Sequence, residues 1–187
     1  MAVNRSDFQH LETKYGRFVS WAIWNPTNRK CPKIIDDKLA RLNPSIVMIG
    51  LNVSANLENS WSNFHIGRND GKLMYAFNDS DYRGAYMTDL IKEEVEPNSK
   101  KIMDRIRSGE LDVKPHVSVF LEEMADIGAN DNSLFIIFGG DASAQFRKHL
   151  GKKFPNRVFC RHYSDRVRTD RWAIETLEKL AHHRLSE

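Results

Sequence analysis

Three side chains that could support proton transfer or position a reacting group stand at the ends of apolar segments of this sequence: Asn52, Asp89 and His162. A histidine can exchange a proton near neutral pH or donate a hydrogen bond to a developing anion. An amide, a carboxylate and an imidazole that shared one site could hold a substrate atom between them. The three residues are far apart in the chain, so the fold must bring them together.

The segments that precede these residues are short and rich in β-branched or aromatic side chains, which is typical of strands buried on both faces. We expect strands at Ile46–Ile49, Gly84–Leu90, Leu134–Phe138 and Arg157–Arg161. Helical patterns alternate with them, at Ile34–Leu42, Pro115–Ile127, Ala142–Leu150 and Asp170–Leu185. This alternation predicts an α/β fold, a three-layer α/β/α sandwich around a mainly parallel, four-stranded sheet.

Ligands of open parallel sheets bind beyond the carboxyl ends of the strands. At these ends the sequence places Asn52 with Ser54, then Asp89, then the run Gly139–Asp141, and finally the run His162–Ser164. Because the carboxyl ends of parallel strands meet at one edge, we expect these residues to share one rim. The sequence therefore predicts a polar site at that edge.

Each residue also has a structural interpretation. Asn52 could cap a helix or a turn, and Asp89 could form an ion pair with Lys92. The Gly139–Asp141 turn resembles a phosphate cradle at a helix start, but Asp141 at the N-cap would repel an anion, which favours plain capping. A lone histidine such as His162 is more often structural than catalytic. Only a shared cleft would favour the chemical interpretation.

Three regions fit the alternation less well. Residues 53–83 form a polar and aromatic stretch that is too long for an ordinary connection, so we expect it to be functional or partly helical. Residues 97–114 have the pattern of a solvated helix and a turn, and the first 30 residues could add an edge strand or a helix. We expect one α/β domain over residues 1–187, with 1–43 as an N-terminal extension and helix and 44–185 as its core.

Composition narrows the function classes. The 28 Lys and Arg residues are nearly balanced by 25 Asp and Glu, so the net charge of +3 does not by itself identify a protein that binds polyanions. The cysteines, Cys31 and Cys160, lack the spacing of a disulfide framework or a zinc site, and the histidines show no ligand pattern. We expect no metal and no cofactor. No apolar run approaches the roughly 20 residues that span a bilayer, so we expect a cytoplasmic protein without a membrane partner.

Two motifs resemble those of the uracil-DNA glycosylase superfamily. The stretch "IVMIGLNVS" is similar to its first motif, especially in the mismatch-specific branch, where a buried strand runs into Gly-x-Asn-Pro-Gly. The stretch "VFCRHYS" resembles its second motif, His-Pro-Ser or Asn-Pro-Ser, and "GAYMTDLIK" and "LFIIFGGDASAQF" keep the order and approximate spacing of its middle strands. The resemblance covers roughly residues 44–185. Val53 and Tyr163 stand where the family has proline.

The resemblance implies hydrolysis of the bond between a deoxyribose and a base that is flipped out of DNA. It implies that Asn52 holds the water and that His162 donates to the base oxygen. A carboxamide cannot take a proton, so Asp89 could assist, or it could read the edge of the base. Phe64 or Phe77 would stack on the base, with Phe77 preferred because it lies closer to the strand "GAYMTDL", and Ser54 is a further base-binding candidate. The alternative is that either phenylalanine belongs to the core or closes the long loop.

Basic residues follow the second motif. The resemblance implies a loop that inserts into DNA and grips its phosphates, and the candidates for this role are Tyr163, Ser164, Arg166, Arg168 and Arg171. The alternative is a solvated loop whose charge is partly neutralised by Asp165 and Asp170. Both interpretations remain open from the sequence.

Two further functions compete with base excision. The same cleft could bind DNA, RNA or a nucleotide without catalysis. Ser54, His162 and Asp89 could instead serve as nucleophile, base and orienting acid of an enzyme acting on a small metabolite. The sequence around Ser54 lacks the Gly-x-Ser-x-Gly elbow that such enzymes often have, which counts against this last option.

Overall fold

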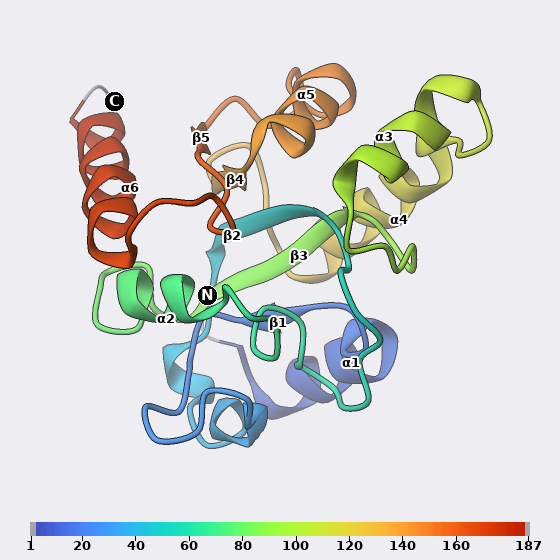
Figure 1. Cartoon of the computed structure of the whole chain (residues 1–187). Coiled ribbons are helices and arrows are strands. Elements are labelled where there is room, and N and C mark those ends of the chain that lie inside the picture. Colours follow the sequence, from blue (N-terminus) through green and yellow to red (C-terminus); the bar gives the residue numbers. More distant parts are fainter. Residues whose placement is uncertain (1–2, 186–187) are drawn as a thin grey trace.

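The computed structural model describes residues 3–185, which build an α/β fold around a five-stranded mixed sheet (Figure 1). The strands are β1 (Ser20–Trp21), β2 (Asn43–Asn52), β3 (Ala85–Ile91), β4 (Leu134–Phe138) and β5 (Arg157–Cys160). Their order across the sheet is β1-β3-β2-β4-β5. All neighbouring pairs are parallel except β1 with β3, which is antiparallel.

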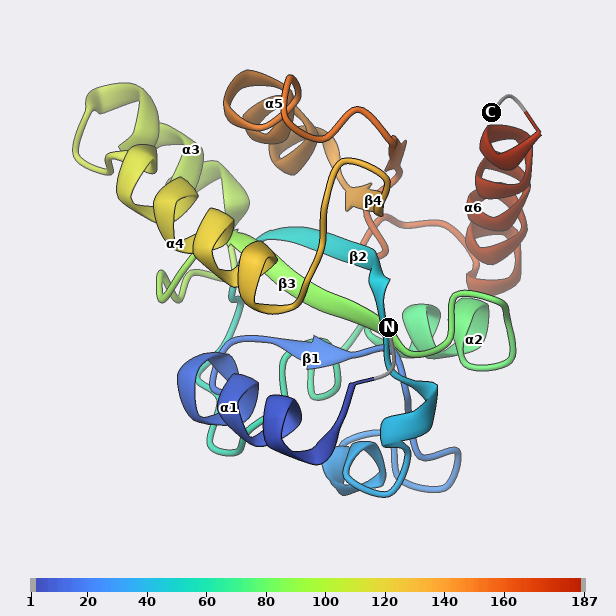
Figure 2. The same ribbon diagram turned by 180° about the vertical axis from the view of Figure 1, so that it is seen from behind.

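Helices pack on both faces of this sheet. They are α1 (Arg5–Tyr15), α2 (Gly71–Phe77), α3 (Ser99–Ser108), α4 (Val113–Asp126), α5 (Gly140–His149) and α6 (Thr169–Arg184). One core contains buried side chains of α1, α3, α4 and α5, and the other contains those of α2 and α6. Figure 1 shows α2 and α6 together at one side of the sheet, and Figure 2 shows α1 and α4 from behind.

The strands supply both cores because successive side chains of a strand point to opposite faces. In β2, Val47 and Ile49 belong to the core with α1, α3, α4 and α5, whereas Met48 belongs to the core with α2 and α6. In β4, the neighbours Phe135 and Ile136 divide in the same way. This two-sided burial explains why these strands are continuous apolar runs rather than alternating ones.

The predicted strands are found, but the expectation of a four-stranded sheet is wrong. The fifth strand comes from the N-terminal region, where Ser20 and Trp21 pair with Met87 and Tyr86 at the edge of the sheet. The first 30 residues therefore supply both an edge strand and a helix. Phe8 and Trp21 are buried in the core that also contains Val47 and Ile49 of β2, so this region is part of the packed fold.

The expectation of a helix over Ile34–Leu42 is wrong as well. The segment forms two short 3₁₀ turns, η1 (Pro32–Ile35) and η2 (Leu39–Arg41). Within the predicted range only Ile35 and Leu42 are buried, which is too little apolar surface to hold a regular helix against the sheet. The other three predicted helices correspond to α4, α5 and α6 with shifts of one or two residues at their ends.

The strand order fixes where a ligand can enter. From β2 the chain passes to β3, which lies on one side of β2 in the sheet. The later strands β4 and β5 lie on the other side of β2. The connections therefore diverge between β2 and β4, and a crevice opens beyond their carboxyl ends at such a switch point. No helix within residues 3–185 is long and apolar enough to cross a lipid bilayer.

Candidate functional site

A cleft of about 670 Å³ lies at this switch point. Its walls come from the ends of β2, β3 and β4, from the residues that follow β5, and from the segments 54–70 and 96–99. The long connection after β2 thus contributes a wall of the cleft, besides forming α2. Pockets of this size accommodate small organic ligands such as a nucleobase.

The cleft brings together most of the residues selected from the sequence. Those that line it are Asn52, Ser54, Phe64, Asp89, Gly139, Gly140, Asp141, His162, Tyr163 and Ser164. The expectation of one shared rim is therefore confirmed. Phe77, Arg166, Arg168 and Arg171 are not part of the cleft wall.

Asp89 forms the buried end of the cleft. Only 3% of the residue is exposed, and its Oδ2 accepts a hydrogen bond of 2.8 Å from Nδ2 of Asn63. Its Oδ1 has no hydrogen-bond partner among the residues that the structure describes, and it occupies the space beside Gly50. Burial raises the pKa of Asp89 to about 7, against the opposing effects of Asn63 and Lys92.

Gly50 is required for this arrangement. It stands opposite Asp89 in the register between β2 and β3, and a Cβ at this position would lie 2.2 Å from Oδ1 of Asp89. A side chain of any other residue would therefore displace the carboxyl group. The glycine in "IGLN" clears room for an acid from the next strand.

Asn63 organises the aromatic wall. Besides its bond to Asp89, its Nδ2 donates to the carbonyl oxygen of Phe18, and its Oδ1 accepts from the backbone N–H of Phe64. Phe64 has a φ of 62°, a left-handed conformation that is unfavourable for a bulky residue by about 1–2 kcal/mol. The bonds of Asn63 hold this conformation, which places the Phe64 ring against the cleft. Neither the role of Asn63 nor the strain at Phe64 has a sequence signal beyond the unusual polar and aromatic stretch.

His162 is held in one orientation. The backbone N–H of Ser164 donates to its Nδ1 at 3.1 Å, and the Ser164 hydroxyl lies 2.7 Å from the same atom. Because a backbone N–H can only donate, Nδ1 is an acceptor and the neutral ring carries its proton on Nε2. Burial lowers the pKa of His162, so the ring is neutral at neutral pH and offers one N–H donor.

The His162 ring is also packed tightly. It stacks on Tyr163 with ring centroids 4.4 Å apart. On another side, a Cβ added to Gly139 would lie 3.0 Å from its Cδ2, and Gly139 has a φ of 90° that favours glycine. Gly139 thus allows the imidazole to approach the end of β4.

Asn52 has a structural role at the end of β2. Its Nδ2 donates to the carbonyl oxygens of Val53, Glu94 and Glu96 at 2.8–3.0 Å, which ties the end of β2 to the segment after β3. These three acceptors fix the orientation of the amide. Its Oδ1 has no partner within residues 3–185, so it is left as an acceptor for a water or a ligand.

The expectation that Asp141 caps α5 is wrong. The helix begins at Gly140 with Gly139 as its N-cap, so Asp141 lies inside the first turn. Its carboxylate accepts a hydrogen bond of 3.0 Å from the hydroxyl of Ser99 at the start of α3. The acid therefore links two helices at the rim of the cleft.

The ion pair considered between Asp89 and Lys92 does not form. Lys92 points into the core on the other side, where its Nζ lies 2.5 Å from Oε2 of Glu123 and 2.6 Å from Oγ1 of Thr88. Ser54 is exposed at the rim, and no hydrogen bond joins any two of Ser54, His162 and Asp89. The described contacts do not build the nucleophile, base and acid relay of a metabolite hydrolase.

Phe77 is remote from the cleft wall. It is fully buried in α2, where its ring lies within 6.3 Å of Tyr82, Phe138 and Trp172. The preference for Phe77 is therefore wrong, and Phe64 is the one of the two rings that lines the cleft. Phe77 belongs to the core because α2 turns this face toward α6.

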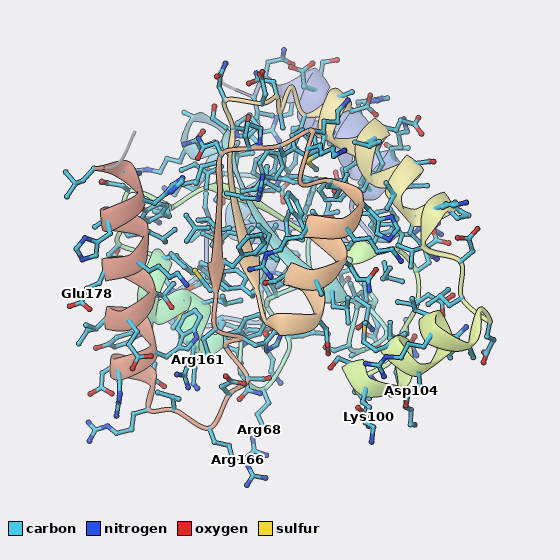
Figure 3. All side chains as sticks on the ribbon, turned by 90° about the horizontal axis from the view of Figure 1, so that it is seen from above. Arg68, Lys100, Asp104, Arg161, Arg166 and Glu178 are labelled. Carbon is cyan, nitrogen blue, oxygen red and sulfur yellow. The ribbon has the colours of Figure 1, made fainter. Side chains whose placement is uncertain are left out.

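The arginines after β5 differ in their partners. Arg168 pairs with Asp170 at 2.8 Å, and Arg171 pairs with Glu175 at 2.8 Å. Arg166 is exposed and has no ion pair with another described residue. Arg68, which the sequence pattern did not single out, is exposed in the cleft wall and is likewise unpaired within 3–185. Figure 3 shows Arg68 and Arg166 extending from the same end of the molecule.

The two segments that carry these arginines are joined. Nζ of Lys72, in the first turn of α2, donates to the carbonyl oxygens of Asp165 and Val167, both at 2.7 Å. This link fixes the segment after β5 against the start of α2, which directly follows the segment that carries Arg68. A negatively charged ligand at the mouth of the cleft could therefore meet Arg68 and Arg166 together.

The part of the chain that the structure describes contains no group of three His, Cys, Asp or Glu side chains that could hold a metal ion. Comparison with known proteins adds no relative. No protein-family model, no curated protein and no solved structure matches this chain.

Proposed function

We propose that this protein hydrolyses the N-glycosidic bond of a base flipped out of DNA, as its resemblance to the uracil-DNA glycosylase superfamily implies. The observation that carries the proposal is that Asn52 and His162 line one cleft, with the acid Asp89 at its buried end. Helices on both faces of the sheet are also compatible with the α/β/α sandwich of that superfamily. DNA is the partner in this proposal.

The reaction needs a positioned water and a donor for the departing base. Oδ1 of Asn52 accepts a hydrogen bond from the water, because its Nδ2 is already engaged with three carbonyl oxygens. The water oxygen bonds to C1′ of the sugar and one water proton passes to solvent, while the electron pair of the glycosidic bond moves onto the base. Nε2–H of the neutral His162 donates to the base oxygen as negative charge develops there.

The ring of Phe64 stacks on the base in this proposal. Its position against the cleft is fixed by Asn63, so the wall is rigid before a ligand arrives. Asp89 lies at the edge of the stacked base. With a pKa of about 7, it can present either an O–H donor or an oxygen acceptor near neutral pH.

The test is base release from duplex DNA that contains uracil or a mismatched thymine, detected as alkali-sensitive abasic sites on a gel. His162→Ala should reduce the rate about a hundredfold or more, because it removes the donor to the leaving base. The double variant with Asn52→Ala should lose more. His10→Ala, which changes an exposed histidine of α1, is the control.

Folding must be checked for the double variant, since Asn52 also ties three carbonyl oxygens. His162→Gln restores a side-chain donor and should recover part of the activity lost in His162→Ala. Equal base release by the wild type and by the folded double variant would refute the mechanism.

A second candidate is a nucleic-acid-binding protein without catalysis. The observation that favours it is the structural role of Asn52, whose amide is explained by its backbone bonds alone. This function predicts salt-sensitive binding that weakens when Arg68 and Arg166 are changed to alanine. It also predicts that no base is released from any substrate.

A further inference from the structure

The cleft is lined by an excess of acidic side chains. Its carboxyl groups belong to Asp70, Asp89, Glu96, Asp141 and Asp165, and among the described residues that line it Arg68 is the only lysine or arginine. The nearby His162 is neutral at neutral pH, because burial lowers its pKa. A cleft of this composition repels phosphate and favours a ligand part that is positively charged.

Some of these acids are already engaged. Oε2 of Glu96 lies 3.5 Å from Nζ of Lys101, and Asp141 accepts from the Ser99 hydroxyl. Asp70 accepts a hydrogen bond of 2.7 Å from the backbone N–H of Gly67. These contacts explain much of the acidic rim without a ligand.

Asp89 is the exception. It is 97% buried, only its Oδ2 has a partner, and its Oδ1 faces the space beside Gly50 in the cleft wall. An ionised carboxylate in this position is unfavourable without a partner. No other group within residues 3–185 supplies a partner to Oδ1, so this oxygen is available to a group that enters the cleft.

Aromatic rings stand beside this acid. Phe64 and Tyr163 both line the cleft, with ring centroids 6.4 Å apart and planes at 61°. A delocalised cation is attracted both by the faces of aromatic rings and by a carboxylate. Aromatic rings and an acid with one unpartnered oxygen are together better suited to a flat cation than to a neutral base.

We propose that the cleft takes a cationic base, meaning a nucleobase alkylated on a ring nitrogen so that the ring carries a positive charge. This inference rests on the proposed function and names its substrate class. Oδ1 of Asp89 faces the charged ring, Phe64 stacks on it, and the phosphates stay outside with Arg68 and Arg166.

The chemistry of the site supports this substrate class. Asn52 cannot accept a proton, and neutral His162 can donate a hydrogen bond to a leaving base but does not protonate it, so a base that leaves uncharged suits the site better than one that leaves as an anion. When the glycosidic bond of a cationic base breaks, its electron pair neutralises the ring and the base leaves uncharged. The water oxygen bonds to C1′ and the water proton passes to solvent. For hydrolysis of a cationic base, the main task left to the protein is to orient the water.

The experiment uses duplex DNA treated with a methylating agent, which contains cationic 3-methyladenine and 7-methylguanine together with O6-methylguanine, the neutral isomer of 7-methylguanine. Released bases are separated and measured against a blank without protein. The wild type should release the two cationic bases above the blank and leave O6-methylguanine in the DNA. Release of all three at similar rates would overturn the inference.

Asp89→Asn keeps the shape of the side chain and removes its charge, so the preference for cationic bases should fall about tenfold or more. Glu178→Gln removes one charge from an exposed position on α6, outside the cleft, and should change nothing (Figure 3). An unchanged preference in folded Asp89→Asn would contradict the role of this acid.

A binding measurement on the wild type does not depend on any variant. By calorimetry, 1-methyladenosine, a cation at neutral pH, should bind about tenfold or more tightly than its neutral isomer N6-methyladenosine. Equal affinities would overturn the inference. Release of uracil without release of cationic bases would also overturn it and leave the proposed function standing. Selective binding of the cation without any base release would sustain the inference about the cleft and refute hydrolysis.

Discussion

Substitution of Gly50 by alanine tests how the floor of the cleft is built. Gly50 in β2 stands opposite Asp89 in β3, and the new Cβ would lie 2.2 Å from Oδ1 and 3.4 Å from Cγ of that residue. The carboxyl group cannot simply rotate away, because Oδ2 is bonded to Asn63 and the residue is 97% buried. Either the strand pair or the carboxyl group must shift.

Overpacking of this kind destabilises a protein by about 1–3 kcal/mol. We expect Gly50→Ala to lower the free energy of unfolding by about 2 kcal/mol in the wild-type background. In an Asp89→Ala background the obstructing oxygen is gone, so the same substitution should change stability by less than about 0.5 kcal/mol. The difference between the two backgrounds isolates the contact between Gly50 and Asp89.

Urea denaturation of the four proteins in this cycle gives the required free energies. Gly140→Ala is the matched control, because a Cβ there meets nothing within 4 Å, and it should change stability by no more than about 0.5 kcal/mol. If Gly50→Ala destabilised both backgrounds equally, the contact with Asp89 could not be the reason for glycine at this position.

Three further predictions concern charge in and around the cleft. The folded pKa of Asp89 is about 7 against an ordinary value of 3.8, so wild-type stability should fall by up to roughly 4 kcal/mol as the pH rises from about 4 through 7. Asp89→Asn should flatten that dependence in denaturation experiments, and parallel curves would contradict the burial argument. Asn63→Ala removes a donor that lowers the pKa of Asp89, so that pKa should rise further in an NMR titration, with a loss of about 1–3 kcal/mol of stability. If the protein binds DNA, Arg166→Ala should reduce the slope of log affinity against log salt concentration by about 1. Arg168→Ala should reduce this slope less, because the charge of Arg168 is already paired with Asp170. Equal effects of the two substitutions would count against a special role for the unpaired Arg166.

The sheet was the most predictable part of this fold. Strands buried on both faces are continuous apolar runs, and Leu134–Phe138 has the bounds expected from its sequence. The edge strand Ser20–Trp21 is too short to give such a signal, and it exists because β3 has a free edge for it. The segment Ile34–Leu42 forms 3₁₀ turns and not the expected helix, because a local apolar pattern does not ensure that a neighbouring surface is present to pack against.

The site was predictable only where it follows from topology. Residues after parallel strands share a rim, and so Asn52, Asp89 and His162 could be grouped before the structure was known. Asn63 and Arg68 lie in the long connection after β2, whose path depends on contacts with Phe18 and with α2 rather than on local sequence. No periodicity could have placed them.

The two glycines at the centre of the site show what sequence reasoning lacked, which is the register of the sheet. Gly50 lies near the end of the inner strand β2, beside Asp89 of the neighbouring strand β3. Gly139 follows the other inner strand, β4, and lies beside His162, which follows the neighbouring strand β5. On each side of the switch point, a glycine of an inner strand leaves space for a titratable side chain from an outer strand. The same missing side chains open the cleft between β2 and β4. The same requirement, space for a titratable side chain, therefore explains glycine at both positions. We expect the cleft to close or distort if Gly50 or Gly139 is replaced by a larger residue.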